Sequence, residues 1–332
     1  MISFTTEQLK QLLGHFSEQK ILVIGDLMLD HYLWGDISRI SPEAPVPVVD
    51  IESEEYKLGG AANVCYNVAT LGATVIPIGV IGNDENGERL SEIFRESRMA
   101  TEGLFIDSSR PTTIKSRVIA RGQHMIRTDR ETRSPLDESL NSQIIRFVSS
   151  HLNDIDGIIF EDYNKGLLSR HLIQTLIGLA KEHHIPVSVD PKFENFFDYE
   201  HVSLFKPNRK ETMDRLGLVQ MDGDALEKAG QKLMDRLHCD ALLITLGDKG
   251  MALFEQGTPL VTIPTQAVKV HDVSGAGDTV IATMAVCLAA GANYKEAATI
   301  ANQAAGIVCG QVGIVPIDKD ELLKTLLRRF NS

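Results

Sequence analysis

The residues best suited to chemistry lie together near the end of the chain, in residues 272–291. Gly275, Ala276 and Gly277 carry little or no side chain, so a ligand can approach their backbone amides closely. An apolar helix is predicted to follow, and a helix N-terminus attracts a phosphate or the negative charge that develops as a phosphoryl group moves. The stretch therefore predicts an anion-binding turn.

Asp278 falls in the first turn of this predicted helix. A carboxylate there can stabilise the helix electrostatically, or it can accept a proton from a substrate hydroxyl. Spacing alone leaves both roles open.

Other polar side chains follow predicted strands. The run Lys20–Gly25 is typical of a buried parallel strand, and Asp26 and Asp30 come after it. Ligands of open α/β sheets bind at this edge, although either aspartate could instead form a turn or cap a helix. The same pattern recurs later in the chain at Glu161, Asp162, Asn164, Lys165, Asp190 and Lys192.

Two further groups of residues have two readings each. Gly59 and Gly60 permit close approach to a ligand, and Asn63 could bind that ligand or serve as a cap or packing residue. Asn208 and Glu211 lie three residues apart, on one face of a predicted helix. They could orient a hydrated Mg²⁺ through oxygen atoms, or they could form a capping box.

The elements that must position these residues alternate between short apolar strands and amphipathic helices, which predicts an α/β fold with a mostly parallel sheet. Two excursions interrupt the alternation, at residues 38–60 and 111–129. The second excursion carries Lys115, Arg117, Arg121 and Arg127. These cations could form a solvated strand face or grip a substrate phosphate.

Composition limits the class of protein. The chain has 332 residues, 43% of them hydrophobic, which is enough for a sizeable core. Its 45 acidic and 33 basic residues give a net charge of −12, which argues against a general nucleic-acid surface. The four cysteines lack C-x-x-C spacing, and no segment has the pattern of a signal peptide or membrane span, so we expect a reduced, cytoplasmic protein.

Several common motifs are absent from the sequence. There is no Gly-Lys dipeptide, hence no Walker A loop, no complete G-x-G-x-x-G after the first strand and no H-E-x-x-H. We predict one α/β domain with a small β excursion.

The segments GGAANV and DVSGAGDT, with KPNRKE and TLGDKG between them, resemble the ribokinase-like, or PfkB, sugar kinases over essentially the whole chain. Within that family, GDLMLDHYLWGDISRISPEAPVPVV, EDYNKG and DPKF are similar to kinases that act on D-glycero-D-manno-heptose 7-phosphate in ADP-heptose synthesis. The resemblance implies a three-layer ribokinase-like fold in a single kinase domain over residues 1–332, with a β lid formed near residues 31–58 and 108–131.

The resemblance also implies a reaction. ATP, with Mg²⁺, would phosphorylate the anomeric hydroxyl O1 and give heptose 1,7-bisphosphate on the route to lipopolysaccharide core sugar. Asp278 would be the base, and the amides of Gly275, Ala276 and Gly277 would form the anion hole. The alternatives are a related kinase acting on ribose, fructose or another sugar phosphate, and a sugar-binding protein without activity.

The remaining site residues follow by resemblance. The sugar would be held by Asp30, Gly59, Gly60 and Asn63, with Asp26 nearby. Its phosphate would contact Arg121, Gln123, Arg127 and Lys192. Asn208 and Glu211 match the N-x-x-E element that organises Mg²⁺ and phosphate, and Glu211 would contact the Mg²⁺ through water. The nucleotide would lie against Thr245, Gly247, Gly250 and Asn302, and a monovalent cation such as K⁺ against Asp272 and Ser274.

Some features depart from the family pattern or extend it. Ser274 replaces the usual threonine, and EDYNKG and DPKF differ from SDYAKG and DPKG. The lid would exclude water and form a homodimer contact that covers Val46, Val48 and Ile51. Because the chain ends at Ser332 without the nucleotidyltransferase domain of many relatives, we expect it to perform the kinase step only.

Overall fold

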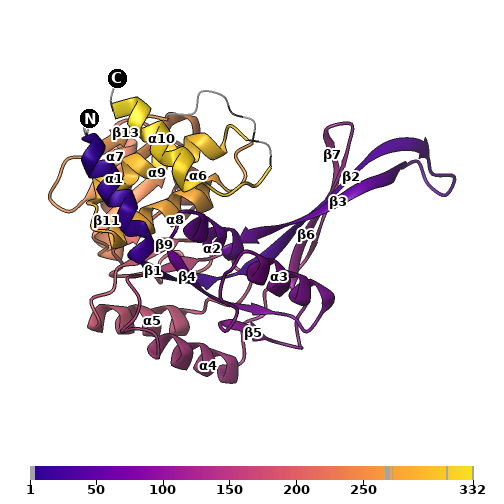
Figure 1. Ribbon diagram of the computed structural model, residues 1–332, viewed down its shortest axis with the longest axis horizontal. Coiled ribbons are helices and arrows are strands. Elements are labelled where there is room, and N and C mark those ends of the chain that lie inside the picture. The colour runs from indigo at the N-terminus through magenta and orange to yellow at the C-terminus, as the bar shows by residue number, and fades with distance from the viewer. Residues whose placement is uncertain (1–3, 266–269, 271, 312, 331–332) are drawn as a thin grey trace.

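A computed structural model describes residues 4–265, 270, 272–311 and 313–330. A nine-stranded sheet forms the centre of the main body, in the order β13-β12-β11-β10-β9-β8-β1-β4-β5. Pairing is parallel from β11 to β5 and antiparallel between β11, β12 and β13. Helices cover both faces of this sheet (Figure 1). The predicted α/β class with a mostly parallel central sheet is confirmed.

The central sheet contains β1 (Lys20–Gly25), β4 (Thr74–Ile81), β5 (Leu104–Ile106), β8 (Gly157–Glu161), β9 (Val187–Asp190), β10 (Leu204–Phe205), β11 (Ala241–Thr245), β12 (Met251–Glu255) and β13 (Val261–Ile263). The α-helices are α1 (Thr6–Gly14), α2 (Ala61–Thr70), α3 (Glu85–Glu96), α4 (Glu138–Ser149), α5 (Arg170–Glu182), α6 (Arg209–Leu216), α7 (Asp224–Leu237), α8 (Ala276–Ala289), α9 (Tyr294–Val308) and α10 (Lys319–Phe330). Two 3₁₀ turns are η1 (His15–Glu18) and η2 (Gly247–Lys249).

The sheet separates two hydrophobic cores, and β1 shows why its apolar run is continuous. Ile21 and Val23 belong to the core beneath α1, α2, α8, α9 and α10. Leu22 and Ile24 belong to the core beneath α4, α5 and α7. Since successive side chains of a strand point to opposite faces, a strand covered on both faces is apolar at every position.

The register of the parallel strands brings three strand ends together. Gly25 at the end of β1 is aligned with Glu161 at the end of β8, and Glu161 is aligned with Asp190 at the end of β9. The chain order changes direction between β8 and β4, on either side of β1. Such a switch point opens a crevice at the carboxyl ends of the strands.

Four strands form a second sheet, here called the arm: β2 (Leu27–Ile40), β3 (Pro47–Gly60), β6 (Thr113–Ala120) and β7 (Gln123–Arg130). Their order is β3-β2-β6-β7. The arm projects from the main body, and its base lies near α2 and α3 (Figure 1). The strands come from the two excursions that interrupt the α/β alternation in the sequence.

The arm has irregular pairing at two levels. The register shifts between Trp34 and Gly35 where β2 pairs with β3, and between Val118 and Ile119 where β6 pairs with β7. Trp34 is itself aligned with Ile119 across β2 and β6, so these two irregularities form a transverse line across the arm, beyond its base. A third shift lies further out, between Ile37 and Arg39 in the β2–β3 pairing.

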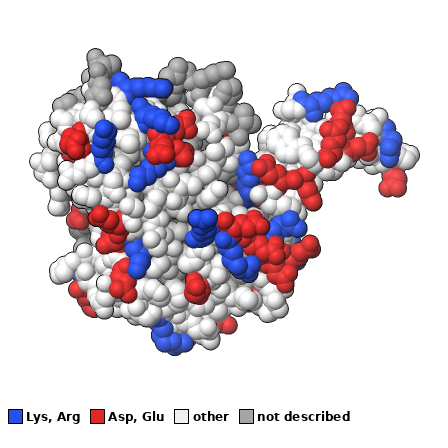
Figure 2. Space-filling view, viewed as in Figure 1, with Lys and Arg blue, Asp and Glu red and all other residues white. Residues whose placement is uncertain are grey.

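The surface is mixed in charge. Acidic and basic side chains are interspersed over the visible face of both the main body and the arm (Figure 2). Within the described residues, no helix combines the length and the apolar character needed to cross a membrane.

Candidate active site

A pocket of about 670 Å³ opens at the carboxyl edge of the central sheet. Its walls come from the ends of β9 and β11, the start of α6, the start of α8 and the middle of α9. The anion-binding turn predicted from sequence lies in this wall, because Gly275, Ala276, Gly277 and Asp278 all line the pocket.

The turn before α8 depends on a left-handed glycine. Gly275 has φ +76° and forms the N-cap of the helix. The amide of Ala276 donates to the carbonyl of Val273 at 3.3 Å, whereas the amides of Gly275 and Gly277 have no acceptor in the described part of the chain. Of the three predicted amides, those of Gly275 and Gly277 are therefore the more available to a bound anion.

Asp278 is 6% exposed and is held by two neighbours. Asn63 Nδ2 donates to Asp278 Oδ2 at 2.7 Å, and the Tyr163 hydroxyl donates to Asp278 Oδ1 at 3.2 Å. Asn67 Nδ2 in turn donates to the Asn63 side chain and backbone carbonyl. Each carboxylate oxygen of Asp278 accepts one hydrogen bond and keeps a lone pair for a substrate hydroxyl.

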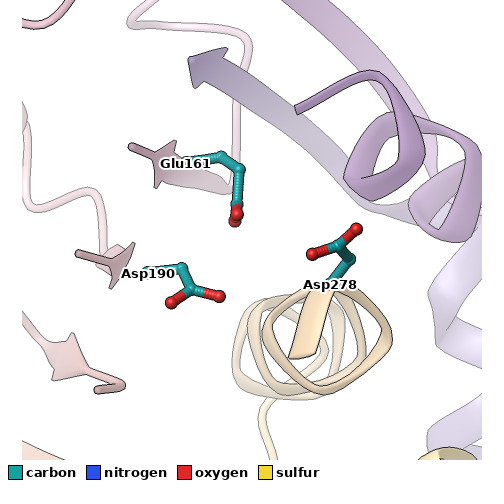
Figure 3. A group of neighbouring side chains, drawn as sticks. All are labelled: Glu161, Asp190 and Asp278. Carbon is teal, nitrogen blue, oxygen red and sulfur yellow. The ribbon is translucent and has the colours of Figure 1, made fainter. Parts of the chain in front are cut away.

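Asp278 also belongs to a group of three buried carboxylates. Oxygen atoms of Glu161, Asp190 and Asp278 lie within 4.8 Å of one another, and their side chains converge on one space (Figure 3). Lys206 Nζ lies 2.6 Å from Asp190 Oδ2 and is equally buried. Glu161 Oε2 has no hydrogen-bond partner among the described residues.

Burial and nearby charges raise the pKa of two of these carboxyl groups, Glu161 and Asp278. Burial, together with the charges of Asp190 and Asp278, raises the pKa of Glu161 well above its ordinary value. Burial also raises the pKa of Asp278 to about 6, although the hydrogen bond from Asn63 partly offsets the rise. A carboxylate with such a pKa is well matched to proton transfer near neutral pH.

We expect the activity of the enzyme to fall at low pH as Asp278 becomes protonated. A base must be ionised to accept a proton, so kcat/KM should decline about tenfold per pH unit below about pH 6. A pH profile from 5 to 9 with direct detection of product checks this. Thermal unfolding over the same range must show that the protein stays folded, and a flat profile down to pH 5 would contradict the assignment.

Gly275→Ala is expected to lower kcat through Asn63. An added Cβ would lie 2.9 Å from Asn63 Nδ2 and 3.3 Å from Ile314, so the amide that holds Asp278 must move. Gly291→Ala is the matched control, because Gly291 has φ +91° with nothing within 4 Å of the added Cβ. Both variants should lose about 1–2 kcal/mol of stability from the left-handed backbone. If both keep wild-type kcat, the steric argument fails.

The residues predicted for the nucleotide side lie together. Thr245, Gly247, Gly250 and Asn302 all line the pocket. Asn302 Nδ2 donates to the carbonyl of Pro264 at 2.7 Å, so its amide is oriented by the segment after β13.

Asn208 and Glu211 form the capping box that was one of their two readings. Asn208 Oδ1 accepts from the Glu211 amide at 2.8 Å, and Glu211 Oε2 accepts from the Asn208 amide at 2.9 Å. The other carboxylate oxygen, Oε1, accepts from Lys192 Nζ at 2.7 Å. The pair therefore caps α6 and also fixes the predicted phosphate contact Lys192 at the pocket wall.

The predicted sugar residues divide between the base of the arm and the main body. Asp30 on β2 is 3% exposed and accepts a hydrogen bond from Arg117. Gly59 leaves the space that Asp30 fills, since a Cβ there would lie 2.4 Å from Asp30 Oδ2. Gly60 has φ +56° and precedes α2, which carries Asn63.

The carboxylate of Asp26 accepts hydrogen bonds from the protein backbone. Its Oδ2 accepts from the backbone amides of Tyr163 at 2.8 Å and Lys165 at 3.1 Å, which fixes the turn after β8. Burial raises its pKa to about 6, and the charge of Asp162 adds to the rise. The turn-forming reading of Asp26 therefore describes its contacts in this chain.

The pair predicted for a monovalent cation forms a local turn. Asp272 Oδ1 accepts from the Ser274 amide at 2.9 Å, and this contact helps to hold the pKa of Asp272 below its ordinary value despite partial burial. His271 lies outside the described residues.

The cations predicted for the sugar phosphate are not all near the pocket. Arg121 is at the β6–β7 turn, is 67% exposed and lies 2.6 Å from Asp36. Gln123 is exposed at the start of β7. Arg127 is 58% exposed on the edge strand and pairs with Asp129. None of the three lines the pocket among the described residues. The structure therefore does not bring Arg121, Gln123 and Arg127 to Asp278, as the prediction of a sugar-phosphate site required. The register of β6 and β7 places them at the far turn of the arm or on its edge strand.

Three residues in the site were not predicted as site residues. Tyr163 touches Asp278, Lys206 neutralises Asp190, and Arg117 holds Asp30. For Lys206, a signal was present in the sequence, since a lysine directly after an apolar strand is placed at the ligand-binding edge. Tyr163 has the same kind of position, two residues after Glu161, where β8 ends.

Comparisons with known proteins identify the family of this chain. The family model described as pfkB family carbohydrate kinase matches residues 18–320. The "Bifunctional protein HldE" of Syntrophotalea carbinolica is 42% identical over 314 residues, covering 95% of this chain and 64% of that protein. The protein of the same name from Helicobacter pylori strain J99 is 43% identical over 305 residues, covering 92% and 65%. This chain spans less than two thirds of the length of these curated relatives.

Solved structures show the same fold. Arabidopsis thaliana ribokinase, solved with ribose and ATP, has a TM-score of 0.74 at 20% identity, covering 93% of this chain and 98% of that chain. Escherichia coli phosphofructokinase-2, solved with potassium, has a TM-score of 0.76 at 19% identity, covering 95% and 99%. The predicted ribokinase-like fold is confirmed. Since the family match includes Asp278, the turn before it and the strands of the arm, this chain belongs to the pfkB family of carbohydrate kinases.

Proposed function

We propose that the chain phosphorylates O1 of D-glycero-beta-D-manno-heptose 7-phosphate and gives heptose 1,7-bisphosphate for ADP-heptose and lipopolysaccharide core synthesis. The observation that carries the kinase chemistry is the buried carboxylate of Asp278, oriented by Asn63 and Tyr163 at the start of α8. The heptose substrate is supported by the string SRISPEAPVPVV and by identity to the HldE proteins over 92–95% of the chain.

In this proposal, Asp278 accepts the proton of the O1 hydroxyl as that oxygen attacks phosphorus. The amides at the start of α8 stabilise the charge on the transferred group, and those of Gly275 and Gly277 have no acceptor among the described residues. Asp30, fixed by Arg117, binds sugar hydroxyls at the base of the arm. These groups contribute position and electrostatic stabilisation, which phosphoryl transfer chiefly requires.

The residues of the pocket fit the cofactors of a kinase. Its volume of about 670 Å³ lies within the range of nucleotide-sized sites. Glu161 and Asp190 supply carboxylate oxygens of the kind that Mg²⁺ prefers, and Glu161 Oε2 has no partner among the described residues. Glu211, proposed to act on Mg²⁺ through water, lines the second pocket, and both of its carboxylate oxygens accept hydrogen bonds. Bound with ATP, Mg²⁺ supplies charge neutralisation to the phosphates. We further propose that Asp272 and Ser274 adjoin a K⁺ site.

The arm is proposed to act as a lid and as a homodimer contact. Ile40, Val46, Ile51 and Ile126 are about half exposed or more on the arm. A second copy of the arm would cover such apolar side chains and keep water from the transferred phosphoryl group.

Coupled ADP release tests the proposal. With Mg²⁺ and ATP, we expect turnover of heptose 7-phosphate and much less with the unphosphorylated heptose, ribose or fructose 6-phosphate. ³¹P NMR of the product should show a phosphate on O1. Preference for another sugar would overturn the heptose assignment and leave the kinase chemistry, and no turnover with any sugar would favour a sugar-binding protein.

A further inference from the structure

Cationic side chains gather around Tyr163, beside Asp278. Lys115 Nζ lies 5.3 Å from the centroid of the Tyr163 ring, and Lys192 Nζ lies 4.9 Å from the same centroid. The two ammonium groups come from different parts of the fold, since Lys115 is on β6 of the arm and Lys192 follows β9. The ring of Tyr163 therefore joins the base of the arm to the pocket.

Two more cations border this cluster. Lys165 Nζ lies 2.6 Å from Glu131 Oε2, and Arg133 Nη2 lies 3.3 Å from Oε1 of the same carboxylate. Arg133 lines a second pocket of about 420 Å³ together with Tyr163 and Lys192. One carboxylate, Glu131, is thus shared by two cations.

Lys115 is the cation with the least compensation. In the part of the chain that the structure describes, it has no carboxylate within ion-pair distance, and it is half-buried. Burial lowers the pKa of Lys115, and the nearby charge of Lys165 lowers it further, although Asp30 acts in the opposite direction. A half-buried ammonium without a carboxylate partner is unfavourable, and a bound anion would remove that cost.

The position of Lys115 relates it to the acceptor and not to the nucleotide. It is aligned with Asp30 across β2 and β6, and Arg117, two residues further on the same face of β6, holds Asp30. Among the described residues, Lys115 does not line the pocket that contains Thr245, Gly247 and Gly250, whereas Lys192 lines both that pocket and the second one. An anion on Lys115 would therefore lie on the sugar side of Asp278.

We propose that Lys115, with Lys165 and Lys192, binds the phosphate group already present on the acceptor sugar and makes the enzyme select phosphorylated over unphosphorylated sugars. This inference rests on the proposed function, because it assumes a phosphorylated acceptor at the same site. The proposed phosphate site lies at the base of the arm. It replaces the phosphate contacts predicted from sequence, Arg121, Gln123 and Arg127, which lie at the turn and on the edge strand of the arm.

The test compares Lys115→Met with Lys115→Arg and with Arg121→Met, a matched loss of charge at the far turn of the arm. The measured quantity is the ratio of kcat/KM for a phosphorylated sugar to kcat/KM for its unphosphorylated form. Lys115→Met should lower this ratio by about 10- to 100-fold, as expected for a lost charged hydrogen bond. Lys115→Arg should keep most of the wild-type ratio, and Arg121→Met should leave the ratio unchanged. None of the variants should change the KM for ATP.

The outcomes separate the two proposals. Wild-type turnover of heptose 7-phosphate tests the proposed function, whereas the ratio in the variants tests the phosphate site with whichever phosphorylated sugar the wild type accepts. An unchanged ratio in folded Lys115→Met, an equal loss for both sugars, a raised KM for ATP alone, or a loss confined to Arg121→Met would each overturn the inference. Thermal unfolding of Lys115→Met and Lys115→Gln checks that both variants are folded.

Discussion

Asp278→Asn is expected to lower kcat by about 100- to 10,000-fold, the usual contribution of a general base. The amide keeps the size of the carboxylate and can still contact Asn63 and Tyr163, but it cannot accept the proton of the sugar hydroxyl. Coupled ADP release at saturating ATP and sugar measures the loss. Because the buried charge is removed, the variant should be at least as stable as the wild type in urea unfolding.

Asp84→Asn is the matched control for a partly buried carboxylate away from the pocket. Asp84 caps α3 and accepts from Thr112, so its loss should reduce stability and leave kcat within a few-fold of wild type. If Asp278→Asn kept more than a tenth of wild-type kcat, Asp278 would retain only the electrostatic role at the helix start that its position also allows.

Lys206→Met should reduce the free energy of unfolding by about 3–5 kcal/mol, the usual cost of removing one partner from a buried ion pair. The Lys206 side chain is 3% exposed, and its ammonium lies 2.6 Å from Asp190 Oδ2. Its removal leaves Asp190 unpaired next to Glu161 and Asp278. Urea unfolding at pH 7.5, above the raised pKa of Asp278, measures the effect.

Two comparisons make the Lys206 result specific. Adding Asp190→Asn should recover most of the lost stability, because the orphaned charge disappears. The penalty should also shrink at pH 5, below the raised pKa of Asp278, since a protonated carboxyl no longer repels its neighbours. A loss smaller than about 1 kcal/mol, or one that is the same at both pH values, would show that water reaches the cluster.

The sequence was sufficient to predict the elements of the main body. Alternating apolar strands and amphipathic helices placed the predicted strand Lys20–Gly25 and the anion-binding turn where the structure has them. Gly275 was predictable because a close ligand approach and a helix start both favour glycine. The capping-box reading of Asn208 and Glu211 is confirmed, since the pair caps α6, and their role toward Mg²⁺ stays a prediction.

The rest depends on tertiary register, which local sequence does not encode. Arg117 and Arg121 are both strand-region cations in the same excursion, yet Arg117 reaches Asp30 and Arg121 reaches Asp36. The difference is set by how β6 aligns with β2. Likewise, Tyr163 joins Asp278 only because a turn after β8 and the start of α8 meet across 115 residues of chain.

The line of irregular pairing across the arm, at Trp34 and Ile119, divides that sheet into two parts with different mechanical roles. Bulges bend and twist a sheet locally. Asp30 and Lys115 lie on the side of the line nearer the main body, whereas Ile40 and Val46 lie beyond it. The outer part can therefore change its angle while Asp30 and Lys115 keep their alignment. In the proposed homodimer, this would let the arm follow a second copy without moving the residues proposed to bind the sugar.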